Sequence, residues 1–147
     1  MAEGKRPTLT LRLGAEAWAS VRKHAEAGYP REVCGLLIGR SGNVAEAEEA
    51  HPCANVNKER AEDRYLMDPL EQLRLEKDAR ARGLDVLGYY HSHPDHPAQA
   101  SATDNQLSWE GVYYLIVAVR DGKVADQRAW WRDPGSPGLE EKVLRLP

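Results

Sequence analysis

The stretch Val86-Leu87-Gly88-Tyr89-Tyr90-His91-Ser92-His93-Pro94-Asp95-His96-Pro97 decides how the rest of the chain is interpreted. Its first five residues form an apolar run typical of a buried strand, and at His91 the composition changes abruptly. Because prolines remove ladder donors and hold the preceding residue extended, we expect residues 91–97 to form a loop leaving the strand end. Three of the five histidines lie in this segment, which makes it the first place to look for metal chemistry.

Two of these histidines are spaced so that both can bind the same metal ion. In an extended segment alternate side chains point the same way, so His91 and His93 face one side and Ser92 faces the other. Asp104 follows His93 by eleven residues, in the first turn of a helix predicted over residues 101–110. Three protein ligands leave the fourth tetrahedral position for water, as in catalytic zinc sites. We therefore expect His91, His93 and Asp104 to bind one zinc ion per chain.

A hydrolytic site of this kind also needs groups that do not bind the metal. Zinc polarises a carbonyl and lowers the pKa of water, but a proton still has to reach the leaving group. Glu32 is the candidate general base, because it stands at the mouth of a strand predicted over residues 33–38. Ser101 is placed to donate a hydrogen bond to the oxyanion of a tetrahedral intermediate.

Each of these residues has a simpler interpretation. Ser101-Ala102-Thr103-Asp104 is also a serviceable helix start, with a hydroxyl cap and an acidic first turn. Capping does not explain two histidines two residues apart after a buried strand. His96 is an alternative nitrogen ligand, although it is better placed in the loop. Cys34 fits apolar packing, and Cys53 lies in a polar segment with no assigned role.

Hydrophobic periodicity along the chain predicts alternating strands and helices. Strands are expected over residues 8–13, 33–38, 44–51, 86–90, 112–119 and 123–131, and helices over residues 15–27, 69–82 and 101–110. We expect Leu70, Leu73 and the stem of Lys77 to face inward. Arg64–Met67 is a candidate short strand. The pattern favours a three-layer α/β domain, residues 1–147, whose tail from Asp133 packs only loosely.

Composition excludes several classes of protein. A chain of 147 residues with 41% apolar and 29% charged residues is long enough for one core and is not typical of disorder. Twenty Lys and Arg against 23 Asp and Glu give a net charge of −3, and without a basic cluster nucleic acid is not an expected partner. The longest apolar run, residues 112–119, is too short to cross a bilayer. The start MAEGKRPTLTLRL lacks the apolar stretch of a secretory signal, so we expect a cytoplasmic protein with free thiols.

The functional residues together are similar to a known pattern. Glu32, then His91-Ser92-His93-Pro94, then Ser101-Ala102-Thr103-Asp104, resembles the JAMM signature of the MPN+ zinc metalloproteases. The segment Glu-Val-Cys-Gly-Leu-Leu-Ile-Gly, residues 32–39, resembles the family's strand after its glutamate. The resemblance runs from Thr8 to Trp131. The short form is similar to bacterial members, some of which act on ubiquitin-like sulfur-carrier proteins. Ala100 departs from the pattern, since relatives often have proline there.

The resemblance implies both a fold and a chemistry. It implies a mixed sheet flanked by helices, in the architecture of the cytidine deaminases. It implies zinc ligation by His91, His93 and Asp104, proton transfer by Glu32 and oxyanion stabilisation by Ser101. The implied reaction is hydrolysis of the amide after the C-terminal Gly-Gly of a ubiquitin-like sulfur carrier, releasing cysteine, as in cysteine biosynthesis, or a short peptide. We expect the glycine tail to lie along the Arg64–Met67 edge.

Two other functions remain open at this point. One is a non-catalytic MPN interaction module, although all five functional positions are filled here. The other is a metallohydrolase of small peptides or amides without a protein substrate. A zinc deaminase is disfavoured because its H-x-E and P-C-x-x-C segments are missing. Imidazole and carboxylate ligands also suit other first-row divalent ions, so zinc is favoured by geometry and resemblance.

Overall fold

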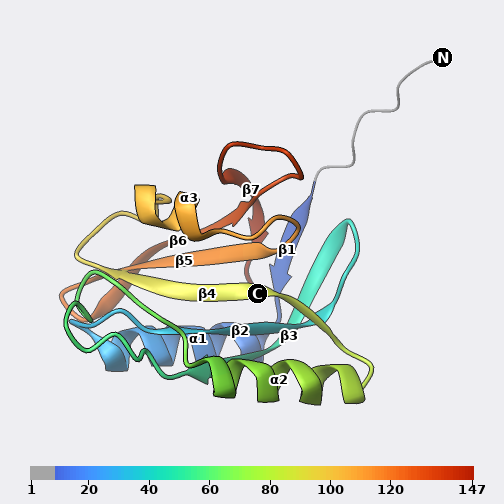
Figure 1. Cartoon of the computed structure of the whole chain (residues 1–147), viewed down its shortest axis with the longest axis horizontal. Coiled ribbons are helices and arrows are strands. Elements are labelled where there is room, and N and C mark those ends of the chain that lie inside the picture. The colour runs from blue at the N-terminus through green and yellow to red at the C-terminus, as the bar shows by residue number, and fades with distance from the viewer. Residues whose placement is uncertain (1–8) are drawn as a thin grey trace.

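The computed structural model describes residues 9–147 and is shown in Figure 1. The expected opening strand begins at Thr10, and its predicted first residue, Thr8, lies outside the described residues, as does most of the segment considered for a secretory signal. The elements in chain order are β1 (Thr10–Leu13), α1 (Ala15–Gly28), β2 (Cys34–Arg40), β3 (Val44–Cys53), α2 (Pro69–Ala81), β4 (Asp85–Pro94), α3 (Ala102–Leu107), β5 (Tyr113–Arg120), β6 (Lys123–Trp131) and β7 (Glu140–Arg145).

The strands form one mixed sheet in the order β1-β3-β2-β4-β5-β6-β7. β1 runs parallel to both β3 and β7, and β4 runs parallel to β5, while the remaining pairs are antiparallel. The pairing of β1 with β7 closes the sheet on itself. Helices on both faces of a mixed sheet confirm the expected α/β class. The closure was not anticipated, because it depends on a strand in the C-terminal segment.

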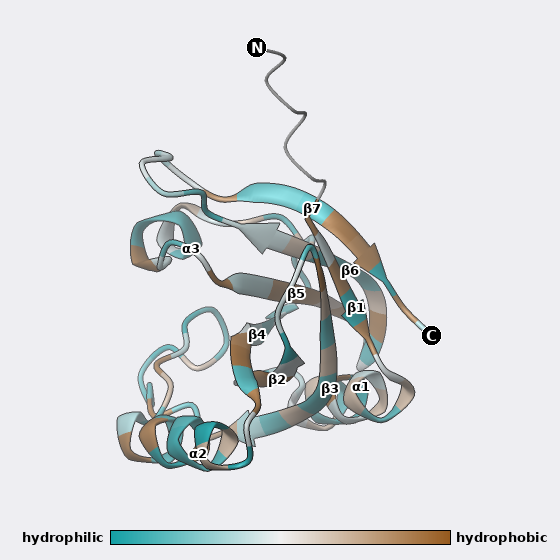
Figure 2. Ribbon diagram, turned by 90° about the vertical axis from the view of Figure 1, so that its right-hand side faces the viewer, coloured by the Kyte–Doolittle hydropathy of each residue, from teal (hydrophilic) through white to brown (hydrophobic). Residues whose placement is uncertain are grey.

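The two faces of the sheet are covered differently (Figure 2). We call the face beneath α1 the α1 face, and the face that carries α2 and α3 the site face. On the α1 face, one continuous core joins α1 to residues from six strands. On the site face there are two smaller clusters, one beneath α2 and one near α3. The central strands are buried because they are covered on both faces, as their apolar runs predicted.

Strand β4 is longer than the sequence suggested. The segment expected to be a loop from His91 onward continues as a strand to Pro94, because β5 pairs in parallel with it up to Pro94↔Val119. Pairing with β2 ends at Cys34↔His91, so one edge of β4 is no longer paired there. A proline is tolerated at such an edge position because no ladder bond needs its N–H. The loop therefore begins at Asp95.

Three further expectations on the site face were wrong in detail. Leu70, Leu73 and Lys77 are exposed. The inward-facing residues of α2 are instead Leu75 and Ala79, which pack over β2 and β4. Arg64–Met67 is not a strand, since its ladder contact is the isolated bridge Asn55↔Met67. The helix expected over residues 101–110 ends at Leu107.

The segment after Asp133, for which we expected loose packing, contains β7. This strand pairs with β6 and β1, and Leu144 packs against the α1-face core. Its alternating exposed and half-buried residues explain the weak sequence signal. Within residues 9–147, the helices are too short or too polar to cross a membrane.

Candidate metal centre and cleft

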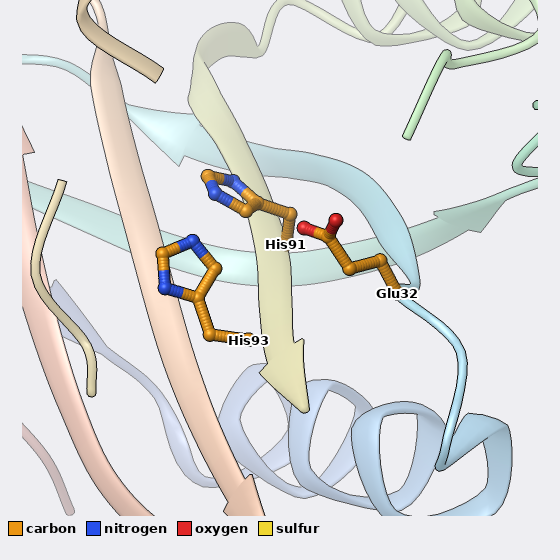
Figure 3. Close-up of side chains that lie close together, drawn as sticks. All are labelled: Glu32, His91 and His93. Carbon is orange, nitrogen blue, oxygen red and sulfur yellow. The ribbon is translucent and has the colours of Figure 1, made fainter. Parts of the chain in front are cut away.

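The two histidines lie at the carboxyl end of β4 and face the site face together (Figure 3). His91 is 1% exposed and His93 is 9% exposed. Ser92 points the other way, as expected, and its Oγ accepts a hydrogen bond of 2.9 Å from the backbone N–H of Val33. The extended backbone of β4 therefore puts both imidazoles on one side while its middle residue ties β4 to the start of β2.

Asp104 meets both imidazoles from the first turn of α3. Its Oδ1 lies 3.0 Å from His91 Nε2, and its Oδ2 lies 3.1 Å from His93 Nε2. The helix-capping interpretation is also present, because Ser101 Oγ accepts from the Asp104 N–H at 3.0 Å and Asp104 Oδ2 accepts from the Ser101 N–H at 2.9 Å. Capping and ligation are therefore compatible, since the cap fixes the carboxylate that faces the histidines.

The hydrogen bonding of this group is incomplete without a cation. His93 Nδ1 lies 2.8 Å from the Pro97 carbonyl, which requires a proton on Nδ1 and leaves the Nε2 lone pair facing Asp104 when the ring is neutral. Two acceptors then face each other, which is unfavourable unless a proton or a metal lies between them. Both ring nitrogens of His91 are buried and lack a hydrogen bond of acceptable geometry, although Nε2 is close to Asp104. These donor atoms fit a divalent metal ion.

Glu32 faces the same group from a position two residues before β2. It is 6% exposed, and a carboxylate oxygen and one nitrogen from each of His91 and His93 lie within 4.8 Å of one another. Figure 3 shows its carboxylate directed toward the imidazoles. Burial raises the pKa of Glu32 to about 7, against the opposing effect of His93. Glu32 thus has a pKa in the range useful for proton transfer near neutral pH.

The charges on the three neighbouring groups are coupled. Burial lowers the pKa of His91, since its charged form would be desolvated. Burial acts to lower the pKa of His93 as well, but Asp104 and the Pro97 carbonyl outweigh it and raise that pKa. Burial acts to raise the pKa of Asp104, but both histidines hold it well below its usual range. Asp104 is therefore an anion in the folded protein.

A cleft of about 640 Å³ opens above this group. One wall is the segment between β3 and α2, and the other is the segment from the end of β4 through α3. The lining includes Glu32, His93, Ser101 and Asp104. His91 lies beneath Tyr65, whose ring stacks on the imidazole with centroids 4.6 Å apart. The atoms that could bind a metal therefore lie at the floor of an open cleft.

The other residues considered from sequence lie outside this cluster. His96 is exposed on the cleft wall. Cys34 and Cys53 face each other across β2 and β3 as buried free thiols. Burial raises the pKa of Cys34 to about 12 and that of Cys53 to about 11, which makes both poor nucleophiles.

Sequence reasoning missed the residues that support the cluster. The sequence indicates Tyr65 only as part of a possible strand, residues 64–67, and does not single out Asn55. Neither has a spacing that would single it out, because each reaches the site through tertiary contacts.

Comparison with known proteins decides the family. Residues 14–133 match the family described as prokaryotic homologs of the JAB domain. The chain belongs to this JAB family. Among JAB relatives, a desampylase of Haloferax volcanii is 40% identical over 121 residues, covering 78% of this chain and 84% of that protein. A CysO-cysteine peptidase of Mycobacterium tuberculosis is 33% identical over 99 residues, covering 67% of this chain and 66% of that protein. A probable TtuB-protein conjugate cleaving protease of Thermus thermophilus is 36% identical over 96 residues, covering 65% of this chain and 62% of that protein.

Solved structures agree with the JAB assignment. A protein from Desulfitobacterium hafniense superposes with a TM-score of 0.79 at 31% identity, covering 93% of this chain and 92% of that one. A JAB1/MPN domain protein from Archaeoglobus fulgidus superposes with a TM-score of 0.55 at 20% identity, covering 97% of this chain and 99% of that one, and supports the fold alone. The JAMM resemblance and the α/β fold are therefore confirmed.

Proposed function

We propose that this JAB protein is a zinc-dependent peptidase that cleaves the amide bond after the C-terminal Gly-Gly of a ubiquitin-like sulfur-carrier protein. The observation that carries the proposal is the convergence of His91, His93 and Asp104 at the floor of a cleft that Glu32 also lines. Relatives named as a desampylase, a conjugate-cleaving protease and a CysO-cysteine peptidase support the hydrolase class and the kind of partner.

His91, His93 and Asp104 would hold the metal, and Glu32 would remain outside its ligand set. Asp104 contacts both imidazoles and is anchored by the Ser101 N–H, so it suits a ligand. Glu32 also lies close enough to bind a metal. Its raised pKa favours a group that gains and loses a proton over one that stays an anionic ligand. When bound, zinc supplies Lewis-acid polarisation of a carbonyl and acidification of water.

The chain's own residues then account for proton transfer and charge stabilisation. Glu32 takes a proton from the attacking water and delivers it to the departing amine. Ser101 Oγ already accepts from the Asp104 N–H, which leaves its own O–H free to donate to the oxyanion. His93 is held in one orientation by the Pro97 carbonyl.

The wall of the cleft suits a glycine tail. The backbone groups of Arg64 and Leu66 form hydrogen bonds within their own loop. The Arg64 carbonyl accepts from the Asn55 side chain, and the Leu66 N–H donates to it. The Leu66 carbonyl accepts from the Val56 N–H. Tyr65 between them lines the cleft, and we expect its backbone groups to point to the opposite edge, toward the cleft. Two glycines can approach that edge closely because they have no side chains. We expect a tail bound in this way to bring its scissile bond near the floor of the cleft.

The test uses a ubiquitin-like sulfur carrier ending in Gly-Gly, fused to a short peptide, with purified full-length protein. Wild type should cleave after Gly-Gly and carry about one zinc per chain. Glu32→Gln should keep zinc and lose on the order of a thousandfold in kcat, whereas His93→Ala should lose zinc and activity together. Retained cleavage by Glu32→Gln would remove Glu32 as the base. A wild type that cleaves only small peptides would point to a peptidase without a protein substrate.

A further inference from the structure

The backbone of Glu32 is hydrogen-bonded to a different part of the chain than the backbone of the residue that follows it. Its N–H donates to the Ala61 carbonyl at 2.6 Å, and its C=O accepts from Asn55 Nδ2 at 3.0 Å. The next residue, Val33, is bonded instead to Ser92 on β4. Glu32 therefore stands at a boundary where the sheet ends and the cleft wall, residues 54–67, takes over.

Asn55 is the side chain that joins these two parts. Its amide nitrogen donates to the carbonyls of Glu32 and Arg64 at 3.0 and 3.1 Å. Its amide oxygen accepts from the N–H groups of Asn57 and Leu66, both at 3.0 Å. These four bonds use both donors and both lone pairs of the amide. A flipped amide would lose all four, so the partners fix its orientation.

We propose that Asn55 is a positioning residue that couples the substrate-facing wall of the cleft to the backbone of Glu32. This inference rests on the proposed function, because it assigns Asn55 an effect on turnover through Glu32. The half-buried amide holds the Glu32 carbonyl with one hydrogen and shapes the wall at Arg64 and Leu66 with its other bonds. A substrate tail that orders the wall would thereby also order the base.

The rate of proton transfer depends on the position of the Glu32 carboxylate. A carboxylate has to lie within hydrogen-bond reach of the water from which it takes a proton. A displacement of about 1 Å at a reacting group costs up to about a hundredfold in rate. Loss of the Asn55 donor frees the Glu32 carbonyl on one side and leaves the Ala61 bond alone to hold the peptide.

Asn55→Asp separates the two roles of the amide. The carboxylate still accepts from the Asn57 and Leu66 N–H groups, so it retains the acceptor bonds of the wall. It cannot donate to the carbonyls of Glu32 and Arg64, and it repels both, so one of the three bonds to the wall is lost together with the bond to Glu32. Asn43→Asp, at an exposed position in the turn between β2 and β3, makes the same chemical change away from the cleft and serves as the matched control.

The experiment measures kcat, KM, bound zinc and thermal stability on the carrier–peptide fusion for wild type and the Asn55→Asp, Asn43→Asp and Glu32→Gln variants. We expect Asn55→Asp to lower kcat about tenfold or more, with KM within about threefold and zinc content unchanged. Asn43→Asp should match wild type. If Asn55→Asp folds poorly, Asn55→Ala removes the same donors without adding a charge. Because it also removes the two acceptor bonds of the wall, we expect it to raise KM in addition to lowering kcat about tenfold or more, and an unchanged kcat in this variant would overturn the inference.

Three outcomes overturn the inference, and they can be told apart. A wild-type kcat in Asn55→Asp, or a loss confined to KM, removes the link to Glu32 while leaving the proposed function intact. Retained activity in Glu32→Gln removes the proposed base and with it the role of Asn55. A wild type that fails to cleave the carrier fusion overturns the proposed function and the inference together.

Discussion

The two faces of the sheet bury their apolar residues in different ways. The α1 face has one continuous apolar core, to which α1 contributes Ala17, Val21 and Ala25. The site face has two separate clusters, and His91 and His93 lie between them. The α1 face thus stabilises the fold mainly by apolar burial, with isolated polar groups such as the Tyr90 hydroxyl bonded to His24 and the buried Tyr113 hydroxyl. On the site face a cluster of polar groups divides the core.

The buried polar groups of the site face lower the stability of the fold, but their burial also strengthens electrostatic interactions at the site. A buried polar group without a hydrogen bond destabilises the folded state by about 1–3 kcal/mol, and the ring nitrogens of His91 are in that situation. The continuous core on the other face tolerates this cost. The same exclusion of water makes the site useful, because charges interact more strongly there than in solvent.

The largest expected effect that distinguishes the faces is stabilisation by metal. Zinc at about a thousand times its dissociation constant should raise the free energy of unfolding by about 4 kcal/mol, because only the folded chain assembles the ligands. Thermal unfolding of the metal-free protein with and without added zinc measures the shift. His93→Ala should lose it, while Leu115→Ala on the α1 face should keep it. An equal zinc shift in His93→Ala would show that the metal binds elsewhere.

Adjacent residues of β5 give the next sharpest comparison. Leu115 and Ile116 are both fully buried, but Leu115 faces α1 and Ile116 lies opposite His91 on the site face. Replacing either by alanine should cost about 2–5 kcal/mol of unfolding free energy, measured by urea denaturation. Only Ile116→Ala should also weaken zinc affinity, by about tenfold, because a cavity beside His91 loosens its orientation. Equal zinc affinities in both variants would show that packing does not orient the ligand.

The sequence predicted the α1 face better than the site face, because apolar burial follows from local patterns whereas polar contacts depend on specific partners. Apolar runs such as residues 33–38 and 112–119 predict strands, and the burial of their side chains needs no specific partner. The clustering of His91, His93 and Asp104 was also readable, because it follows from a strand period and a helix start. Their roles as metal ligands remain proposals.

What the sequence could not predict depends on pairing between distant segments. The extension of β4 through Pro94 requires β5 beside it, and the closure of the sheet requires β7 beside β1. Leu70 and Leu73 fit an apolar helix face, yet the way α2 docks leaves both exposed. Asn55 acquires its four bonds only after the wall folds against Glu32.

The smallest expected effect concerns an exposed ion pair on the rim of the same sheet. Glu49 on β3 accepts two hydrogen bonds from Arg82, at 2.7 and 2.9 Å, and one from His51. Arg82 and then His51 lower the pKa of Glu49 from 4.5 to about 2. Asp104, whose carboxylate faces His91 and His93, is much less accessible, with 8% of its side chain exposed against 32% for Glu49. Solvent screening should therefore limit the contribution of Glu49 to about 1 kcal/mol or less.

The pH dependence of Glu49→Gln tests this limit. Because folding lowers the pKa of Glu49, its ionised form stabilises the folded chain fully above pH 4.5, and this contribution disappears as the pH falls toward about 2. The difference in unfolding free energy between wild type and Glu49→Gln should therefore shrink from pH 7 to pH 3 in urea titrations of metal-free protein. It should also shrink in high salt, which screens exposed charges. A difference of several kcal/mol that persists in salt would mean that the rim pair is as shielded from water as Asp104, and the contrast between rim and cleft floor would fail.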